Sequence, residues 1–197
     1  MRFRRFHLAG LLICGLSLPL QAATVMVFGD SLSAAYGLSP SQGWVALLAR
    51  DLAPKHKVVN ASLSGETTAG GLSRLPQALA THKPDWVILE LGANDGLRGL
   101  PLPAMQANLQ RMIRLSRQAH ANVLLIGIAL PPNYGPDYTR AFHAVYDRLA
   151  RELKLSYVPQ LMAGFAGDLS RFQADGIHPA ASAQGQMMQT VRQALPL

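Results

Sequence analysis

Five short apolar runs, separated by longer segments with a helical spacing of apolar residues, are the strongest constraint on the fold of this 197-residue chain. Apolar runs of this length, bounded by glycine or polar residues, are typical of buried strands. Strands that alternate with helices build a mainly parallel sheet covered on both faces. The runs lie at 25–28, 58–60, 86–91, 123–128 and 156–158, and the helical segments at 44–52, 72–79, 103–120, 138–153 and after residue 179.

This alternation predicts a single three-layer α/β/α domain over residues 23–197, with a flavodoxin-like five-stranded parallel sheet in the order 2-1-3-4-5. The chain reverses its direction of winding between the first and third strands in that order. The loops after the first three strands carry Ser31, Gly65 and Asn94. We therefore expect these three residues to meet at one end of the sheet, where open α/β sheets bind ligands.

The first 22 residues have the pattern of a secretory signal peptide. Three arginines precede an apolar stretch from Leu8 to Leu20, which is too short for a comfortable membrane span, and small residues follow it. We expect cleavage after Ala22, with Ala23 as the second choice. The sequence therefore predicts export to the periplasm and no stable membrane insertion after processing.

Processing also changes the composition of the chain. The single cysteine, Cys14, lies in the predicted signal peptide, so the mature chain has no thiol nucleophile. Loss of three arginines lowers the formal net charge from +7 to +4, and the remaining basic residues are scattered. Without a basic run, the sequence favours a solvated surface over a nucleic-acid interface.

Acyl transfer requires a nucleophile, a base, a group that orients the base, and donors for the developing oxyanion. Ser31 follows the first strand and can act as the nucleophile. His178 can be the base, with Asp175 three positions earlier on a loop and able to hold the imidazole. The backbone N–H groups of Ser31 and Gly65 and the side-chain amide of Asn94 can form the oxyanion hole.

Each of these residues also has a purely structural interpretation. Ser31 can cap a following helix. His178 can shape a helix start before a proline, and Asp175 can be a turn residue. Asn94 begins the turn-forming sequence Asn-Asp-Gly, and Gly65 can be needed only for a positive φ.

The four segments taken together are much more specific than any one residue. Gly29-Asp30-Ser31-Leu32-Ser33, Asn60 to Gly65, Gly92 to Asp95, and Asp175 to Pro179 resemble the four signature blocks of the SGNH or GDSL hydrolases. The resemblance covers essentially the whole mature chain. It is strongest to a branch of periplasmic thioesterases that are also described as lysophospholipases and arylesterases.

This resemblance implies a serine esterase with Ser31, Asp175 and His178 as the triad and Ser31, Gly65 and Asn94 as the oxyanion donors. It implies fatty-acyl esters and thioesters as substrates, with no metal or cofactor. The loop after the fourth strand offers Tyr134 and Tyr138, and with Pro131 and Leu97 it can line an open acyl groove, although it can also be only a rigid connection.

Two other functions remain compatible with the sequence. A carbohydrate O-acetyl esterase can use the same triad, and a non-catalytic binding module can have the same fold. We expect a monomer that acts on small-molecule esters.

Overall fold

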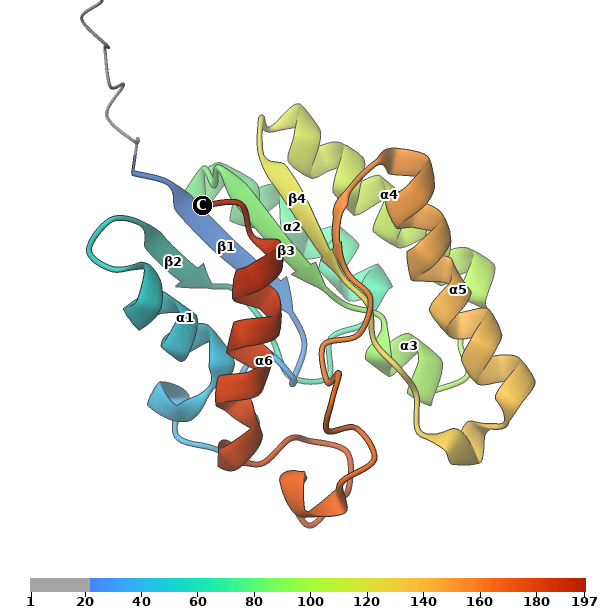
Figure 1. Ribbon diagram of the computed structural model, residues 1–197. Helices are drawn as coiled ribbons and strands as arrows, with labels where there is room; N and C mark the ends of the chain where they lie inside the picture. Colours follow the sequence, from blue (N-terminus) through green and yellow to red (C-terminus); the bar gives the residue numbers. More distant parts are fainter. Residues whose placement is uncertain (1–21) are drawn as a thin grey trace, which may run out of the picture.

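A computed structural model describes residues 22–197, so the predicted signal peptide, with Cys14, lies outside the described residues except for Ala22. One parallel sheet in the order β2-β1-β3-β4-β5 forms the centre of the fold and confirms the predicted topology (Figure 1). The strands are β1 (Thr24–Gly29), β2 (Lys57–Asn60), β3 (Trp86–Glu90), β4 (Asn122–Ile126) and β5 (Ser156–Val158).

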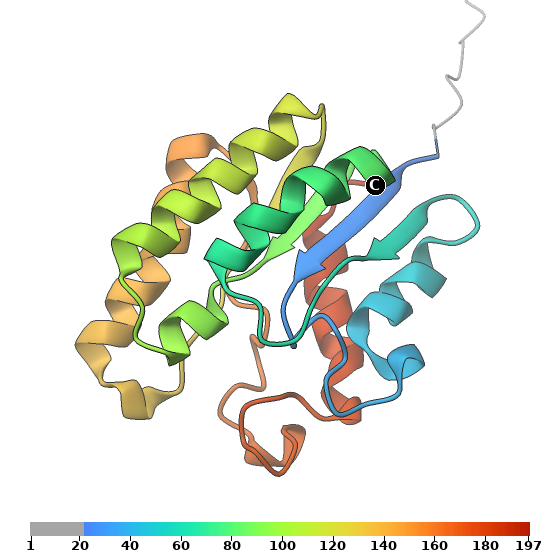
Figure 2. The same ribbon diagram turned by 180° about the vertical axis from the view of Figure 1, so that it is seen from behind.

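Helices cover both faces of the sheet. α1 and α6 pack together on one face (Figure 1), and α2 and α4 cover the other, with α5 against α4 (Figure 2). The helices are α1 (Trp44–Leu52), α2 (Thr68–His82), α3 (Ala93–Leu97), α4 (Leu102–Gln118), α5 (Pro136–Leu153) and α6 (Ala181–Ala194), with short 3-10 turns at Pro40–Gln42, Pro132–Tyr134 and Leu169–Arg171. Among residues 22–197, no helix has the length and apolar character needed to cross a membrane.

β1 lies between β2 and β3 and is deeply buried. Its four residues from Val25 to Phe28 have no exposed surface, which explains why the run is continuously apolar. The register pairs Gly29 with Glu90, so β1 and β3 end side by side. A Cβ atom at Gly29 would lie 2.5 Å from Glu90 Oε2, so only glycine fits there.

Gln184 links α6 by hydrogen bonds to two segments at the carboxyl end of the sheet. Its side chain is buried, and its Oε1 accepts a hydrogen bond from the backbone N–H of Trp44 at 2.9 Å. Its Nε2 donates to the carbonyl of Pro179 at 3.2 Å. One amide thus joins the start of α1 to the segment that follows His178.

Two buried carboxyl groups lie beneath the strand ends. Glu90 Oε2 accepts hydrogen bonds from Ser33 Oγ at 2.6 Å and from the backbone N–H of Asp30 at 3.4 Å. Burial raises the pKa of Asp30 to about 7, against the hydrogen bonds from Leu32 and Asn94 that lower it. Burial, and then the neighbouring Asp30 carboxyl, raise the pKa of Glu90 well above its usual value.

We predict that Gln184→Met lowers the free energy of unfolding by about 1–3 kcal/mol, because it leaves the buried N–H of Trp44 without an acceptor. Urea denaturation of the mature protein measures this change. Gln189→Met is the matched control, since Gln189 is exposed on the same helix. Equal stability of the two variants would contradict the assigned role of Gln184.

We also predict a pH-dependent stability that arises from Glu90 and Asp30. Their raised pKa values mean that the folded protein holds protons that the unfolded chain releases above about pH 4. The stability that these protons contribute is therefore present at low pH and is lost as the pH rises through the folded pKa values.

Urea denaturation at several pH values between about 5 and 8 tests this prediction. The free energy of unfolding of the wild type should fall with pH more steeply than that of Glu90→Gln, which cannot ionise at this position. Glu152→Gln changes an exposed carboxyl and should keep the wild-type slope. Parallel slopes for the wild type and Glu90→Gln would show that Glu90 does not contribute.

Candidate active site

Ser31, His178 and Asp175 form a continuous hydrogen-bonded relay at the carboxyl end of β1. The distance from His178 Nε2 to Ser31 Oγ is 2.8 Å, and that from His178 Nδ1 to Asp175 Oδ2 is 2.7 Å. The imidazole side chain is 18% exposed, so one edge of it remains open to the solvent. The structure thus joins residues 147 positions apart in the sequence.

The turn after β1 presents Ser31 outward instead of using it as a helix cap. Residues 31–37 form turns and not a helix, and Asp30 Oδ1 accepts the N–H of Leu32 at 3.0 Å within the first of them. The buried Trp44 indole N–H donates a hydrogen bond to the carbonyl of Leu32 at 3.1 Å and restrains the loop that carries Ser31. The helix-cap interpretation of Ser31 is therefore wrong, and its hydroxyl is directed at His178.

A compact turn sets the position of the Asp175 carboxylate. Its Oδ1 accepts the backbone N–H groups of Ile177 and His178, while Oδ2 faces the imidazole. Burial acts to raise the pKa of Asp175, but the hydrogen bonds from His178 and Ile177 outweigh it and lower the pKa to about 2. The carboxylate is therefore ionised at neutral pH, as a group that orients an imidazole requires.

The backbone N–H groups of Ser31 and Gly65 are among those at the site that have no acceptor within residues 22–197. Gly65 adopts φ +78°, a conformation that a residue with a side chain rarely adopts. Gly65 thus has the positive φ that its structural interpretation requires, and its N–H also has no acceptor among the described residues. Arg98 donates to the carbonyl of Gly65 at 3.1 Å and steadies this loop.

Asn94 lies beside these donors on α3, directly after β3. The sequence Asn-Asp-Gly forms this short helix rather than the turn that its composition suggests. Asp95, next in the chain, anchors α3 because its buried carboxylate accepts hydrogen bonds from Thr68 N at 2.8 Å and from Thr68 Oγ1 at 2.5 Å. The Asn94 amide donates to Asp30 Oδ2 at 3.2 Å and to the Glu66 carbonyl at 3.0 Å.

A cavity of about 620 Å³ opens beside Ser31 and is lined mostly by apolar side chains. It is large enough for a drug-sized or lipid-like molecule. One wall follows α3 and the end of β4, and the other follows the segment between β5 and His178. Its lining includes Leu97, Ile128, Leu130, Pro131, Met162, Leu169, Phe172 and Ile177.

The two predicted tyrosines lie outside this lining. Tyr134 Oη donates to the carbonyl of Leu97 at 3.0 Å, and Tyr138 Oη donates to that of Gly96 at 3.1 Å. Their rings stack with centroids 6.4 Å apart. They join α3 to the loop after β4, while Leu97 and Pro131 do line the cavity as expected.

Sequence reasoning missed the second wall of the cavity. The segment from Gln160 to Phe172 contributes apolar side chains without the regular spacing of a strand or helix. Tyr36 was missed as well, although its ring lies 4.4 Å from the His178 ring between centroids. The one available signal was the cluster of apolar residues Leu161, Met162 and Phe165 in a stretch otherwise rich in turn formers.

Comparison with curated proteins gives relatives over most of the chain. Esterase TesA from Pseudomonas aeruginosa is 52% identical over 173 residues, which cover 86% of this chain and 86% of the relative. Thioesterase 1/protease 1/lysophospholipase L1 from Escherichia coli is 43% identical over 181 residues, which cover 91% of this chain and 87% of the relative.

A solved structure and a family model agree with these relatives. A crystal structure of TesA has a TM-score of 0.85 and 51% identity and covers 88% of this chain and 98% of that one. The model of the GDSL-like Lipase/Acylhydrolase family matches residues 27–185, a range that contains the relay, the open N–H groups and the cavity. The chain therefore belongs to the GDSL-like lipase/acylhydrolase family, as the four sequence segments predicted.

Proposed function

We propose that this protein is a serine esterase that hydrolyses carboxylic esters and thioesters of fatty acids through an acyl-enzyme on Ser31. The observation that carries the proposal is the relay itself, with Ser31 Oγ 2.8 Å from His178 Nε2 and His178 Nδ1 2.7 Å from Asp175. Relatives named esterase and thioesterase 1/protease 1/lysophospholipase L1 support the same chemistry.

In the first half of the reaction, Ser31 Oγ attacks the carbonyl carbon while His178 Nε2 takes the hydroxyl proton. The ionised Asp175 holds the imidazole in the required tautomer and stabilises the imidazolium. The bond to the leaving group then breaks, and His178 gives its proton to the departing alcohol or thiol. Water repeats the sequence on the acyl-enzyme, which releases the fatty acid and restores Ser31.

The negative charge on the tetrahedral intermediate is stabilised by three donors, the N–H groups of Ser31 and Gly65 and the amide of Asn94. The two backbone donors have no other acceptor among the described residues, so they need no rearrangement. Both Asn94 N–H groups have protein acceptors, and the bond to Asp30, at 3.2 Å, is the longer one. We propose that the Asn94 amide gives up its hydrogen bond to Asp30 and donates to the substrate oxygen instead.

The acyl chain of the substrate occupies the apolar cavity between α3 and the segment before His178. We assign Leu97 and Pro131 to direct contact with the chain. Tyr134 and Tyr138, by contrast, support that wall through their bonds to α3. A cavity open to solvent can accept many leaving groups, both alkyl and aryl.

We further propose that residues 1–22 are a signal peptide and that residues 23–197 act as a periplasmic monomer. Ala23 is buried and its N–H donates to His56 Nδ1 at 3.1 Å, so this residue belongs to the folded domain and cleavage after Ala22 preserves it. The relay and all three donors come from one chain, which makes a second copy unnecessary for catalysis.

We predict that the mature protein hydrolyses p-nitrophenyl esters from two to sixteen carbons with activity that rises toward medium or long chains, and that Ser31→Ala abolishes turnover. A long-chain acyl-CoA and a lysophospholipid are assayed alongside. Ser73→Ala, an exposed serine on α2, should keep wild-type activity.

Each other outcome of this experiment selects a different function. Activity confined to the acetate ester would favour a carbohydrate O-acetyl esterase. No activity, together with no covalent labelling of Ser31 by an organophosphorus ester, would leave a binding module.

We predict that Asn94→Ala lowers kcat/KM about a hundredfold, since loss of one oxyanion donor costs about 3 kcal/mol of transition-state stabilisation. Steady-state kinetics with p-nitrophenyl butyrate measures the loss. Asn122→Ala, at the start of β4 and thus at the opposite end of the sheet, is the control. An unchanged rate for Asn94→Ala would remove this residue from the oxyanion hole.

A further inference from the structure

The exposed large apolar side chains gather at one end of the molecule. Within residues 22–197 there are six, and each lies on a segment that follows the carboxyl end of a strand: Tyr36, Leu63, Leu100, Tyr134, Leu169 and Ile177. Leu169 is 77% exposed and Leu63 is 50% exposed. We call these six residues the apolar rim.

The apolar rim surrounds the mouth of the cavity beside Ser31. Tyr36, Leu169 and Ile177 line the cavity, while Leu63 and Leu100 flank the loops that carry Gly65 and α3. Isolated exposed apolar residues need no explanation, but a group confined to one opening indicates an interaction surface. An apolar path therefore leads from the outer surface to the proposed nucleophile.

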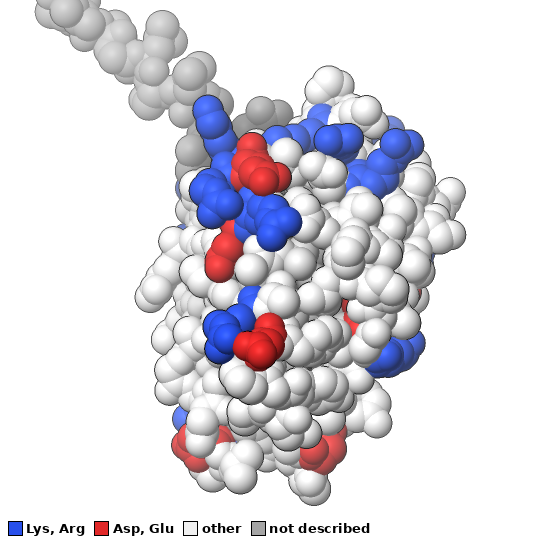
Figure 3. All heavy atoms as spheres, turned by 90° about the vertical axis from the view of Figure 1, so that its right-hand side faces the viewer, with Lys and Arg blue, Asp and Glu red and all other residues white. Residues whose placement is uncertain are grey.

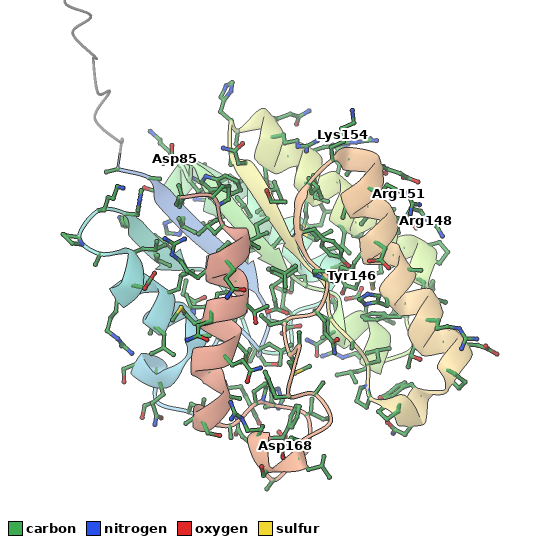
Figure 4. All side chains as sticks on the ribbon, in the orientation of Figure 1. Asp85, Tyr146, Arg148, Arg151, Lys154 and Asp168 are labelled. Atoms are coloured by element: carbon green, nitrogen blue, oxygen red, sulfur yellow. The ribbon has the colours of Figure 1, made fainter. Side chains whose placement is uncertain are left out.

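The lysine side chains lie at the other end of the molecule, away from the apolar rim. All four lysines of the mature chain lie at or just before the start of a strand: Lys55, Lys57, Lys83 and Lys154. Figure 3 shows most of the Lys and Arg side chains in its view on that half of the surface, and Figure 4 places Lys154 and Arg151 there, with Asp168 at the other end.

Near the apolar rim, most acidic side chains have cationic neighbours. Glu66 pairs with Arg74 at 3.0 Å, and Asp137 pairs with Arg140. Asp168 begins the short turn that ends with Arg171. The ionised Asp175 has no Lys or Arg partner, but Arg98, which is in no ion pair among the described residues, lies at the same end. The rim therefore carries little net charge, which suits contact with a zwitterionic surface better than contact with an anionic one.

We propose that the apolar rim docks the protein on a lipid–water interface, so that a fatty-acyl substrate passes from the lipid into the cavity without crossing water. This proposal rests on the acyl-ester function proposed above. Exposed leucine and aromatic side chains that enter the boundary between headgroups and acyl chains bind such surfaces through buried apolar area. When the rim contacts the lipid, the methylene groups of the acyl chain are not exposed to water during transfer, which avoids an unfavourable free energy.

A lipid surface fits the rim better than a protein partner does. The six side chains come from the five segments that follow the five strands around an opening, and a fluid surface can accommodate each of them independently. A rigid partner or a second copy of the chain seated on the rim would close the cavity mouth to substrate. A lipid surface instead supplies substrate at that mouth.

Flotation with phosphatidylcholine vesicles tests the docking without any turnover, because the protein used carries Ser31→Ala. Leu63→Ser and Leu100→Ser are added together, since neither leucine lines the cavity. We expect the partition coefficient of the double rim variant to fall at least about tenfold, from the apolar area that the two leucines no longer bury. Thermal unfolding confirms that the variants are folded.

A matched pair of added leucines provides the converse test in the same Ser31→Ala protein. Asn133→Leu places an apolar side chain next to Tyr134 on the rim, and we expect it to increase vesicle binding severalfold. Gln118→Leu places the same side chain at the end of α4, near the strand starts, and should leave binding unchanged. Equal effects of the two changes would overturn the proposal.

Kinetics with catalytically intact protein separates docking from chemistry. The Leu63→Ser/Leu100→Ser variant should hydrolyse monomeric p-nitrophenyl butyrate at the wild-type rate and a lysophospholipid above its critical micelle concentration several times more slowly. Loss of both activities would contradict a docking role. Absence of hydrolysis by the wild type would refute the proposed function but leave the vesicle result interpretable.

Two further results would overturn the proposal. Binding only to anionic vesicles, abolished by salt, would assign the contact to the basic residues near the strand starts. A dimer that the double rim variant dissociates, in a protein that does not bind phosphatidylcholine vesicles, would make the rim an interface between copies of the chain.

Discussion

The parallel pairing of β1 with β2 and β3 is the constraint on which the rest of the structure depends. Because the three strands run in the same direction and end together, the loops that carry Ser31, Gly65 and Asn94 must meet. Gly29 has no room for a Cβ atom beside Glu90, which lets β1 and β3 end in close contact. The core therefore sets the geometry of the proposed nucleophile and the proposed oxyanion donors, and Gln184 of α6 holds the segment that places His178 beside Ser31.

Buried polar groups convert this general geometry into a specific one. Asp30 links the turn at Ser31 to Asn94, and Gln184 links α1 to the segment after His178. Such groups are costly to bury unless they have partners, so each one favours a single arrangement of its loop. Glu90 Oε1 differs, because it has no hydrogen-bond partner among the described residues and the charge of this carboxyl is disfavoured by its burial.

Catalytic geometry and substrate access depend on different parts of the chain. The relay and donors lie on loops that are fixed by hydrogen bonds to the core. The two main walls of the cavity come from the longer segments after β3, β4 and β5, and the apolar rim takes side chains from the segments after all five strands. Changes in these segments can alter substrate choice while the relay stays intact.

The sequence by itself determined the strand order, the sheet direction and the identity of the relay residues. Continuous apolar runs and four short motifs encode these features locally, and the rules for parallel sheets do the rest. Only the tertiary structure decided that no helix follows Ser31, that Asn94 lies on a helix, and which residues form the second wall of the cavity. Those outcomes depend on contacts between segments far apart in the chain, such as Asp95 with Thr68, and no local pattern reports such contacts.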